Sequence, residues 1–402
     1  MRLRLAVDQS LVLRRLVRRA GVRPRAVTAA RPPLDQPIGV KLELTYRCNL
    51  RCGFCYTDSP RRTLEGTLDL PDDAWRRIVE DAIGLGVIEA VITGGEPLLR
   101  RELALASIER LAEAGIGVSL NTNGWFVDDD VADRLAAVRG IRVHVSIDGA
   151  SAQVHDASRG VSGSWRRAVE AVDRLLARGI TVQANHVVNP ANAPSLDDFL
   201  EHMWLLGVRT VGISTVVPIG AAARSRGWGV EHRRLHRAAH TARGRHGSDL
   251  VVLLVPPAVE GLATRDDRPP ASLLVRPNGA VVMDSVHPFS LGRAHEGLGE
   301  CWERILEHWR DPAIRDWGRE IRSAGRMTEL PVVSYRDDEV PLAGPPVPVT
   351  AGHRRESGRL LEPPEALTPT DLDVARREIL DLTLARSYRL GDVRWAGSAS
   401  RD

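Results

Sequence analysis

Short apolar runs alternate with longer amphipathic stretches from about residue 38 to residue 217. The short runs are rich in valine, isoleucine and leucine, which is typical of buried strands. In the longer stretches, apolar positions recur at helical spacing. The pattern predicts strands at Val40–Thr45, Ala90–Thr93, Gly117–Leu120, Arg142–Ile147, Thr181–Val188 and Thr210–Val216, and helices at 72–85, 101–115, 128–138, 164–178 and 195–206.

Six strand–helix units in succession predict an α/β fold with a parallel sheet. Beyond them, Leu250–Val255 is an apolar run, and Leu273–Met283 has a hairpin pattern that turns at Pro277-Asn278-Gly279. A helix is expected near 300–310. We therefore expect four parts: a basic N-terminal arm at 1–37, the strand–helix domain at 38–240, a small α+β extension at 241–330, and a Pro-rich linker with a terminal helix at 331–402.

Composition narrows the class of protein. The formal net charge of the 402 residues is only +3, so we expect no nucleic-acid partner. No run of about 18 apolar residues occurs, so we expect no transmembrane helix and no membrane partner. The N-terminus lacks the apolar core and cleavage site of a secretory signal, and the expected location is the cytoplasm.

Three of the four cysteines, Cys48, Cys52 and Cys55, lie within eight positions just after the first expected strand. Such a cluster of thiols is typical of metal binding, whereas a disulfide framework spreads along the chain. Three thiolates at spacings of four and three fit three corners of a cubane iron–sulfur cluster and leave one iron open for a small molecule. A zinc site is the alternative, although structural zinc normally takes four protein ligands.

Two further features accompany the three cysteines. Phe54 stands just before the last cysteine, and Thr93-Gly94-Gly95-Glu96-Pro97 follows the second expected strand. In this arrangement the chain resembles the radical S-adenosylmethionine (radical SAM) superfamily. The resemblance implies one 4Fe–4S cluster on the three cysteines and S-adenosyl-L-methionine (SAM) as cosubstrate. Gly94, Gly95 and Glu96 are expected to receive its methionine amino group, since glycines let a backbone approach a ligand and a carboxylate suits an ammonium group.

Other segments resemble the parts of that family that line the SAM pocket. Asn121 and Asn123 follow the third expected strand, Ser146 and Asp148 end the fourth, and Arg159 is the expected partner of the SAM carboxylate. For the last three residues the alternative is a strand-end cap or a surface ion pair. These motifs fall at the carboxyl ends of expected strands, where barrel-like parallel folds assemble their active sites. The resemblance implies a partial (β/α)6 TIM-like barrel over about residues 38–220.

The chemistry that the resemblance implies is reductive cleavage of SAM. An electron from a flavodoxin- or ferredoxin-type donor enters the cluster, and the resulting 5′-deoxyadenosyl radical removes a hydrogen atom from the substrate. The cofactors carry the reaction, while the protein orients the substrate and excludes water.

The segment Leu273–Asp284 resembles the start of a SPASM-type extension, which holds auxiliary iron–sulfur clusters in related enzymes. Asp284 stands where the first cluster cysteine would be, and Cys301 is the only later cysteine. One thiol is too few for a further cluster, so we expect a SPASM-like scaffold without auxiliary clusters. Cys301 is then a buried structural thiol. Asp284 and His287 are the catalytic candidates, and the alternative for both is a solvated loop.

Three functional hypotheses remain open at this point. The main one is an enzyme in the maturation of a ribosomally made peptide or another natural product. The first alternative acts on a small metabolite, such as a sugar, amino acid or nucleoside, as an epimerase, dehydratase or decarboxylase. The second is a non-catalytic iron–sulfur scaffold protein, which the intact cysteine and Gly-Gly-Glu motifs disfavour.

Overall fold

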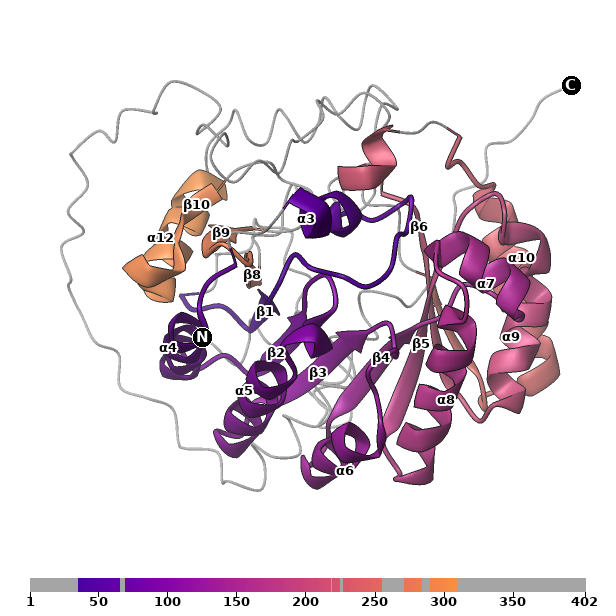
Figure 1. Cartoon of the computed structure of the whole chain (residues 1–402), viewed down its shortest axis with the longest axis horizontal. Coiled ribbons are helices and arrows are strands. Elements are labelled where there is room, and N and C mark those ends of the chain that lie inside the picture. The colour runs from indigo at the N-terminus through magenta and orange to yellow at the C-terminus, as the bar shows by residue number, and fades with distance from the viewer. Residues whose placement is uncertain are drawn as a thin grey trace, which may run out of the picture.

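The computed structural model of the protein describes residues 35–65, 69–217, 219–224, 227–254, 271–283 and 290–309. Within them, the strands form one ten-stranded sheet with the order β10-β9-β8-β1-β2-β3-β4-β5-β6-β7 (Figure 1). The strands are β1 (Gly39–Glu43), β2 (Glu89–Thr93), β3 (Gly117–Thr122), β4 (Arg142–Ser146), β5 (Thr181–Val188), β6 (Thr210–Thr215), β7 (Val251–Leu254), β8 (Ser272–Val275), β9 (Ala280–Val282) and β10 (Ser290–Arg293).

The strands from β8 through β1 to β7 pair in parallel, whereas β9 pairs antiparallel with β8 and with β10. Across β1, Lys41 lies opposite Val91 of β2 and Leu274 of β8. All six expected strands are present to within a few residues of their expected ends, and the expected α/β fold is confirmed. The structure adds β7 beside β6 and β8 beside β1, so its parallel part is wider than the six predicted units.

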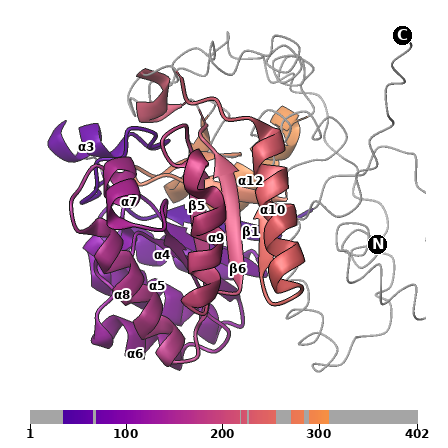
Figure 2. The same ribbon diagram turned by 90° about the vertical axis from the view of Figure 1, so that its right-hand side faces the viewer.

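Helices cover one face of the sheet, as Figure 1 shows for α4, α5, α6 and α8 and Figure 2 for α9 and α10. The helices are α3 (Ser59–Glu65), α4 (Asp72–Gly84), α5 (Arg101–Glu113), α6 (Asp129–Ala137), α7 (Ala152–Arg159), α8 (Ser164–Ala177), α9 (Leu196–Leu205), α10 (His232–His246) and α12 (Leu298–Trp309).

One apolar cluster joins this outer face of the sheet to the helices. It includes Val40 and Leu42 of β1, Trp75 of α4, Ile108 of α5 and Phe199 of α9. Each of these side chains is at most 3% exposed. Removing so much apolar surface from water is the main force that holds the helices on the sheet.

The opposite face of the sheet, called the inner face below, carries polar and charged side chains. Successive side chains of a strand point to opposite faces. Because Val40 and Leu42 pack outward, Lys41 and Glu43 lie on the inner face. On β4 the charged and polar residues alternate in the same way with outward valines.

The sequence pattern missed α3, α7 and α10. In α10 the buried positions are Leu235, Ala238 and Ala242, a narrow stripe of mostly small residues on a helix rich in arginine and histidine. Such a stripe gives too little apolar periodicity to be recognised from sequence. The expected domain boundary at residue 240 falls inside α10, and the domain boundaries stay predictions.

The small extension has the hairpin and helix that its sequence predicted. The β8–β9 hairpin turns where expected, at Pro277-Asn278-Gly279, and α12 starts at Leu298. On α12 the thiol of Cys301 is fully buried and lies 3.5 Å from the carbonyl oxygen of Arg293, in agreement with a structural thiol.

Several expected features lie outside the described residues. They are the catalytic candidates Asp284 and His287, most of the basic arm, and the Pro-rich linker with its terminal helix. In the part that is described, no helix combines the length and apolarity that crossing a membrane would need.

Candidate functional site

The three clustered cysteines lie on the cysteine loop, residues 47–58, which leads from β1 to α3. Their side chains share one small apolar cluster with Leu50 and Phe54. Cys52 is buried, and Cys48 and Cys55 are half-buried. The loop therefore holds three free thiols close together in largely nonpolar surroundings.

Burial also shifts the pKa of two of these thiols, Cys48 and Cys52. It raises the pKa of Cys52 to about 11, and it raises that of Cys48 further, with the Glu96 carboxylate adding to the effect. In the free protein both groups are therefore neutral thiols at pH 7. The backbone N–H of Leu50 donates to the sulfur of Cys48 at 3.4 Å, and the Cys55 sulfur lies 3.2 Å from the hydroxyl of Thr57.

The Gly-Gly-Glu segment that follows β2 packs directly on the entrance to the cysteine loop. The N–H of Gly95 donates to the carbonyl of Thr45 at 2.6 Å, and the N–H of Glu96 donates to that of Arg47 at 2.8 Å. A Cβ on Gly95 would lie 2.2 Å from the Arg47 carbonyl oxygen, and one on Gly94 would lie 2.7 Å from that of Thr45. Both glycines are therefore required by backbone packing, in addition to any role toward a ligand.

Glu96 is fully buried and joins two segments. Its carboxylate accepts hydrogen bonds from the N–H of Leu98 at 3.1 Å, the hydroxyl of Thr122 at 2.8 Å and the N–H of Asn123 at 2.8 Å. Burial raises the pKa of Glu96 to about 7, although these hydrogen bonds oppose the shift. The carboxylate thus fixes the loop after β3 to the loop after β2.

The two predicted asparagines lie at the carboxyl end of β3. The amide of Asn123 donates to the side-chain oxygen of Asn49 at 2.8 Å and lies 3.8 Å from the sulfur of Cys48. The side-chain nitrogen of Asn49 and the side-chain oxygen of Asn121 are buried without a hydrogen-bond partner among the described residues. Buried polar atoms are normally paired, so these two atoms stand out at this end of the sheet.

Asp148 and Arg159 form a buried ion pair beside Cys52. The Nε of Arg159 lies 2.7 Å from the Asp148 carboxylate, and the two side chains are 9% and 0% exposed. The same guanidinium lies 4.0 Å from the sulfur of Cys52 and 5.5 Å from the ring centre of Phe54. Asp148 also accepts from the N–H of Val187 at 2.8 Å, so it ties α7 to the end of β5.

The structure brings the predicted residues together at the carboxyl end of the sheet. Asn123 approaches Cys48, Arg159 approaches Cys52, and Glu96 connects to Asn123. Ser146 ends β4 opposite Asn185 of β5 and is half-buried. The predicted roles of these residues toward a cofactor stay predictions.

The sequence reasoning missed a set of contacts that fixes the loop just after the third cysteine, Cys55. Asp58 has a φ of 55°, and among the described residues it is the only one other than glycine with a positive φ. Arg224 donates to both of its carboxylate oxygens at 2.7 Å, and Arg61 donates to it at 2.7 Å. The N–H of Ala221 also donates to the carbonyl of Cys55 at 2.8 Å. The segment after β6 thus holds the loop in a strained conformation, and no local sequence signal links residues 166 positions apart.

A second group of charges that the sequence reasoning missed lies on the inner face. Tyr56, next to Cys55, donates its hydroxyl to Glu43 at 2.9 Å. Lys41 donates to the Tyr56 oxygen at 3.4 Å, and Arg276, just after β8, donates to Glu43 at 3.1 Å. The alternation of charged and apolar residues in Val40–Leu44 is the signal that pointed to such a face.

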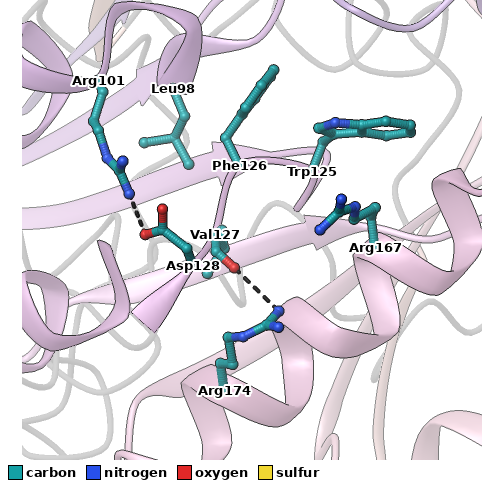
Figure 3. A pocket seen from close by; sticks show the side chains of 8 residues that line it. All are labelled: Leu98, Arg101, Trp125, Phe126, Val127, Asp128, Arg167 and Arg174. Atoms are coloured by element: carbon teal, nitrogen blue, oxygen red, sulfur yellow. Dashed lines mark hydrogen bonds and ion pairs between the residues drawn. The ribbon is translucent and has the colours of Figure 1, made fainter. Parts of the chain in front are cut away.

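A pocket of about 260 Å³ lies outside this site, between the short helix η1 (Pro97–Arg100), the loop after β3 and α8 (Figure 3). Arg101 pairs with Asp128 there, and Arg174 approaches the Val127 carbonyl. Arg167 lies over the ring of Trp125, which also packs against the apolar cluster of the cysteine loop. The pocket adjoins the cysteine loop, but its charges are engaged by neighbouring groups.

Comparison with known families agrees with this geometry. Residues 42–205 match the family model described as the radical SAM superfamily. The chain contains a radical SAM domain. The matched stretch runs from β1 to the end of α9, so it includes the cysteine loop, the Gly-Gly-Glu segment and the Asp148–Arg159 pair. Members of this superfamily use a 4Fe–4S cluster and SAM.

Named relatives of the radical SAM domain are enzymes. The chain is 34% identical over 201 residues to the mycofactocin maturase MftC of Mycobacterium ulcerans, covering 50% of this chain and 53% of that one. It is 28% identical over 202 residues to the PqqA peptide cyclase of Granulibacter bethesdensis, covering 50% and 51%. The chain thus spans about half the length of the curated relatives that it matches.

Solved structures share the fold over a longer stretch. The crystal structure of Streptococcus suis SuiB bound to the precursor peptide SuiA superposes with a TM-score of 0.56 and 16% sequence identity. The superposition covers 72% of this chain and 67% of SuiB. The likeness therefore extends beyond the radical SAM domain, at the level of fold.

Proposed function

We propose that this chain is a radical SAM enzyme with one 4Fe–4S cluster held by Cys48, Cys52 and Cys55, and that it modifies a peptide. When bound, the cluster and SAM supply a 5′-deoxyadenosyl radical that takes a hydrogen atom from the substrate. The observation that carries the proposal is the cysteine loop, whose three thiols are packed against the Gly-Gly-Glu segment and the Asp148–Arg159 pair.

The donor set suits a cubane cluster. Three thiols share one apolar cluster, and cubane clusters are held by cysteine thiolates on separate irons. Across the described residues, no three His, Cys, Asp or Glu side chains converge on a point where one metal ion would sit. A cubane cluster does not require such convergence.

The remaining residues would bind and orient SAM. We assign the two unpartnered atoms, on Asn49 and Asn121, to polar groups of SAM, because Asn49 lies on the cysteine loop and Asn121 lies at the carboxyl end of β3. Among the described residues, Oε2 of Glu96 accepts one hydrogen bond, from the N–H of Asn123, and its second lone pair is suited to the methionine ammonium group. Arg159, together with Ser146 and Asp148, would complete the pocket.

A peptide substrate is supported by the named relatives, a maturase and a peptide cyclase. We also propose that a flavodoxin- or ferredoxin-type protein supplies the electron. With four cysteines in the chain and three on the cysteine loop, the enzyme would work without an auxiliary cluster.

The direct test is 5′-deoxyadenosine formation measured by mass spectrometry. Protein reconstituted anaerobically with iron and sulfide is given SAM and dithionite. We expect product from the wild type and from the Cys301→Ala variant, because Cys301 lies on α12 and is not part of the cysteine loop. We expect loss of product and of bound iron from a Cys48→Ala variant.

Two outcomes would contradict the proposal. Equal loss of iron in Cys301→Ala and Cys48→Ala would place the cluster elsewhere, and zinc without sulfide would replace the cluster with a zinc site. For the substrate, a deuterated peptide should pass deuterium to 5′-deoxyadenosine. Transfer from a small metabolite and never from a peptide would favour the metabolite hypothesis.

A further inference from the structure

We propose that His144 and Gln183, on the inner face of the sheet, form a subsite that binds an uncharged amide group of the substrate. The proposal rests on the proposed function, because it places the substrate of that enzyme beside SAM. Three properties of the two side chains support it: their position, their burial and their unused hydrogen-bonding groups.

The two side chains are neighbours on adjacent strands. His144 lies in β4 between Val143 and Val145, which pack outward. Gln183 of β5 lies directly opposite His144 in the parallel pairing, so both side chains point to the inner face. On its other side, His144 lies opposite Asn121 of β3, which we assign to SAM. A group bound at His144 is therefore next to a residue of the proposed SAM pocket.

His144 is buried but makes no hydrogen bond. It is 5% exposed, and among the described residues neither ring nitrogen has a hydrogen-bond partner or is fully closed off from water. Burial lowers the pKa of His144 to about 4, and the positive charge of Arg142 adds to the effect. At pH 7 the ring is therefore a neutral imidazole, which offers one N–H donor and one nitrogen acceptor.

Gln183 is held in one orientation and has an unused carbonyl oxygen. Its side-chain nitrogen donates to the side-chain oxygen of Asn185 at 2.7 Å. No described residue donates to its carbonyl oxygen, although Gln183 is only 7% exposed. Gly212 of β6 lies opposite Asn185, and a Cβ there would lie 2.9 Å from both members of the amide pair. Glycine at this position leaves room for the pair, which fixes the carbonyl oxygen beside His144.

Buried hydrogen-bonding groups are costly when no partner meets them. Adjacent strands lie about 4.8 Å apart, so His144 and Gln183 present their groups at two separate points. An amide carries its N–H and its C=O on different atoms. It can therefore donate to the Gln183 oxygen while it accepts from the His144 N–H.

Other common ligand groups fit these two points less well. A hydroxyl presents a single oxygen, and a carboxylate at pH 7 has no hydrogen to donate to Gln183. A peptide, which is the substrate class proposed above, carries amides in its backbone and on asparagine and glutamine side chains. The subsite therefore matches a chemical group that every peptide contains.

The experiment follows the reaction of His144 with diethyl pyrocarbonate, which acylates neutral imidazole. Anaerobically reconstituted protein, without SAM or reductant, is treated in the presence of one probe at about 200 mM, because such small molecules bind weakly. Mass spectrometry quantifies the modification of His144. His240, on the exposed side of α10, is the internal control for loss of reagent.

Four probes separate the possible ligands. N-methylpropanamide stands for a backbone amide and propanamide for a side-chain amide. Methyl propanoate has the shape of N-methylpropanamide without its N–H, and 1,2-propanediol stands for the hydroxyl groups of a sugar.

We expect at least one of the amides to slow the modification of His144 about threefold relative to His240, and the ester and the diol to leave it unchanged. The amide that protects better identifies the source of the bound group. In the Gln183→Met variant, which keeps the size of the side chain and loses its carbonyl oxygen, protection by that amide should weaken.

Two results would overturn the proposal. One is equal modification of His144 with the amides and with the ester or the diol. The other is a His144 that reacts only after denaturation, because an inaccessible ring cannot receive a ligand. The measurement needs no SAM cleavage. Protection without 5′-deoxyadenosine formation would therefore keep the subsite and reject the proposed function, and the reverse result would do the opposite.

Discussion

On the outer side of β1, Val40 and Leu42 pack against the helices and are at most 3% exposed. On the inner side of the same strand, Lys41 and Glu43 join a hydrogen-bonded cluster that reaches the cysteine loop. The outer face is held by apolar contacts with many neighbours, and the inner face by a few directional contacts between charges. Stability and chemistry are therefore assigned to opposite faces of one strand.

The largest loss of stability is expected for the buried ion pair of the site, Asp148–Arg159. Asp148→Asn leaves the Arg159 guanidinium buried without its counter-charge. We expect a loss of about 3–5 kcal/mol in the free energy of unfolding, measured by urea denaturation of the apoprotein. The matched control is Asp173→Asn on the exposed side of α8, which should have little effect. An equal loss in both variants would show that the buried counter-charge does not set the loss. A double variant with Arg159→Met should recover part of the loss.

A somewhat smaller loss in the free energy of unfolding is expected from a substitution on the outer face. Leu42→Ala removes a fully buried side chain from the main apolar cluster and should cost about 3 kcal/mol in the same assay. Lys41→Met, one residue earlier on the other face, should cost less than about 1 kcal/mol. Equal losses from these neighbouring substitutions would contradict the conclusion that the outer face of β1 provides stability and the inner face does not.

The inner face should also contribute a dependence of stability on pH. Burial raises the pKa of Glu89 from 4.5 to about 7, against the opposing charge of Arg142. Between these two values the folded state holds a proton that the unfolded state has released. This contribution to stability is therefore fully present below about pH 4.5 and is lost as the pH rises through about 7.

The measurement for Glu89 is the free energy of unfolding of the apoprotein at several pH values. Glu89→Gln should reduce the decrease in the free energy of unfolding between pH 4.5 and 7 by about 2–3 kcal/mol, whereas Glu113→Gln, on the exposed side of α5, should keep the wild-type slope. An unchanged slope in Glu89→Gln would mean that this carboxyl titrates normally.

Much of the fold and part of the site were open to prediction from sequence because the signals are local. The strands show as short apolar runs, and the three cysteines and the Gly-Gly-Glu segment are short motifs. Arg276 and Glu43 are 233 positions apart, and Arg224 and Asp58 are 166 apart, so only the folded sheet brings them together. The prediction for Gly95 was also incomplete. Its close approach to the Arg47 carbonyl depends on how two loops pack, which the sequence does not show.

The smallest effect is expected for an ion pair on the outer surface of the helices. Arg110 of α5 donates two hydrogen bonds of 2.7 Å to Glu80 of α4, and the side chains are 43% and 54% exposed. The shortest contact equals the 2.7 Å of the Arg159–Asp148 pair, so the two pairs differ chiefly in their access to water. Glu80→Gln should therefore change the free energy of unfolding too little to resolve by urea denaturation, at low or at high salt. A loss as large as that of Asp148→Asn would mean that contact geometry, rather than burial, sets the strength of ion pairs in this protein.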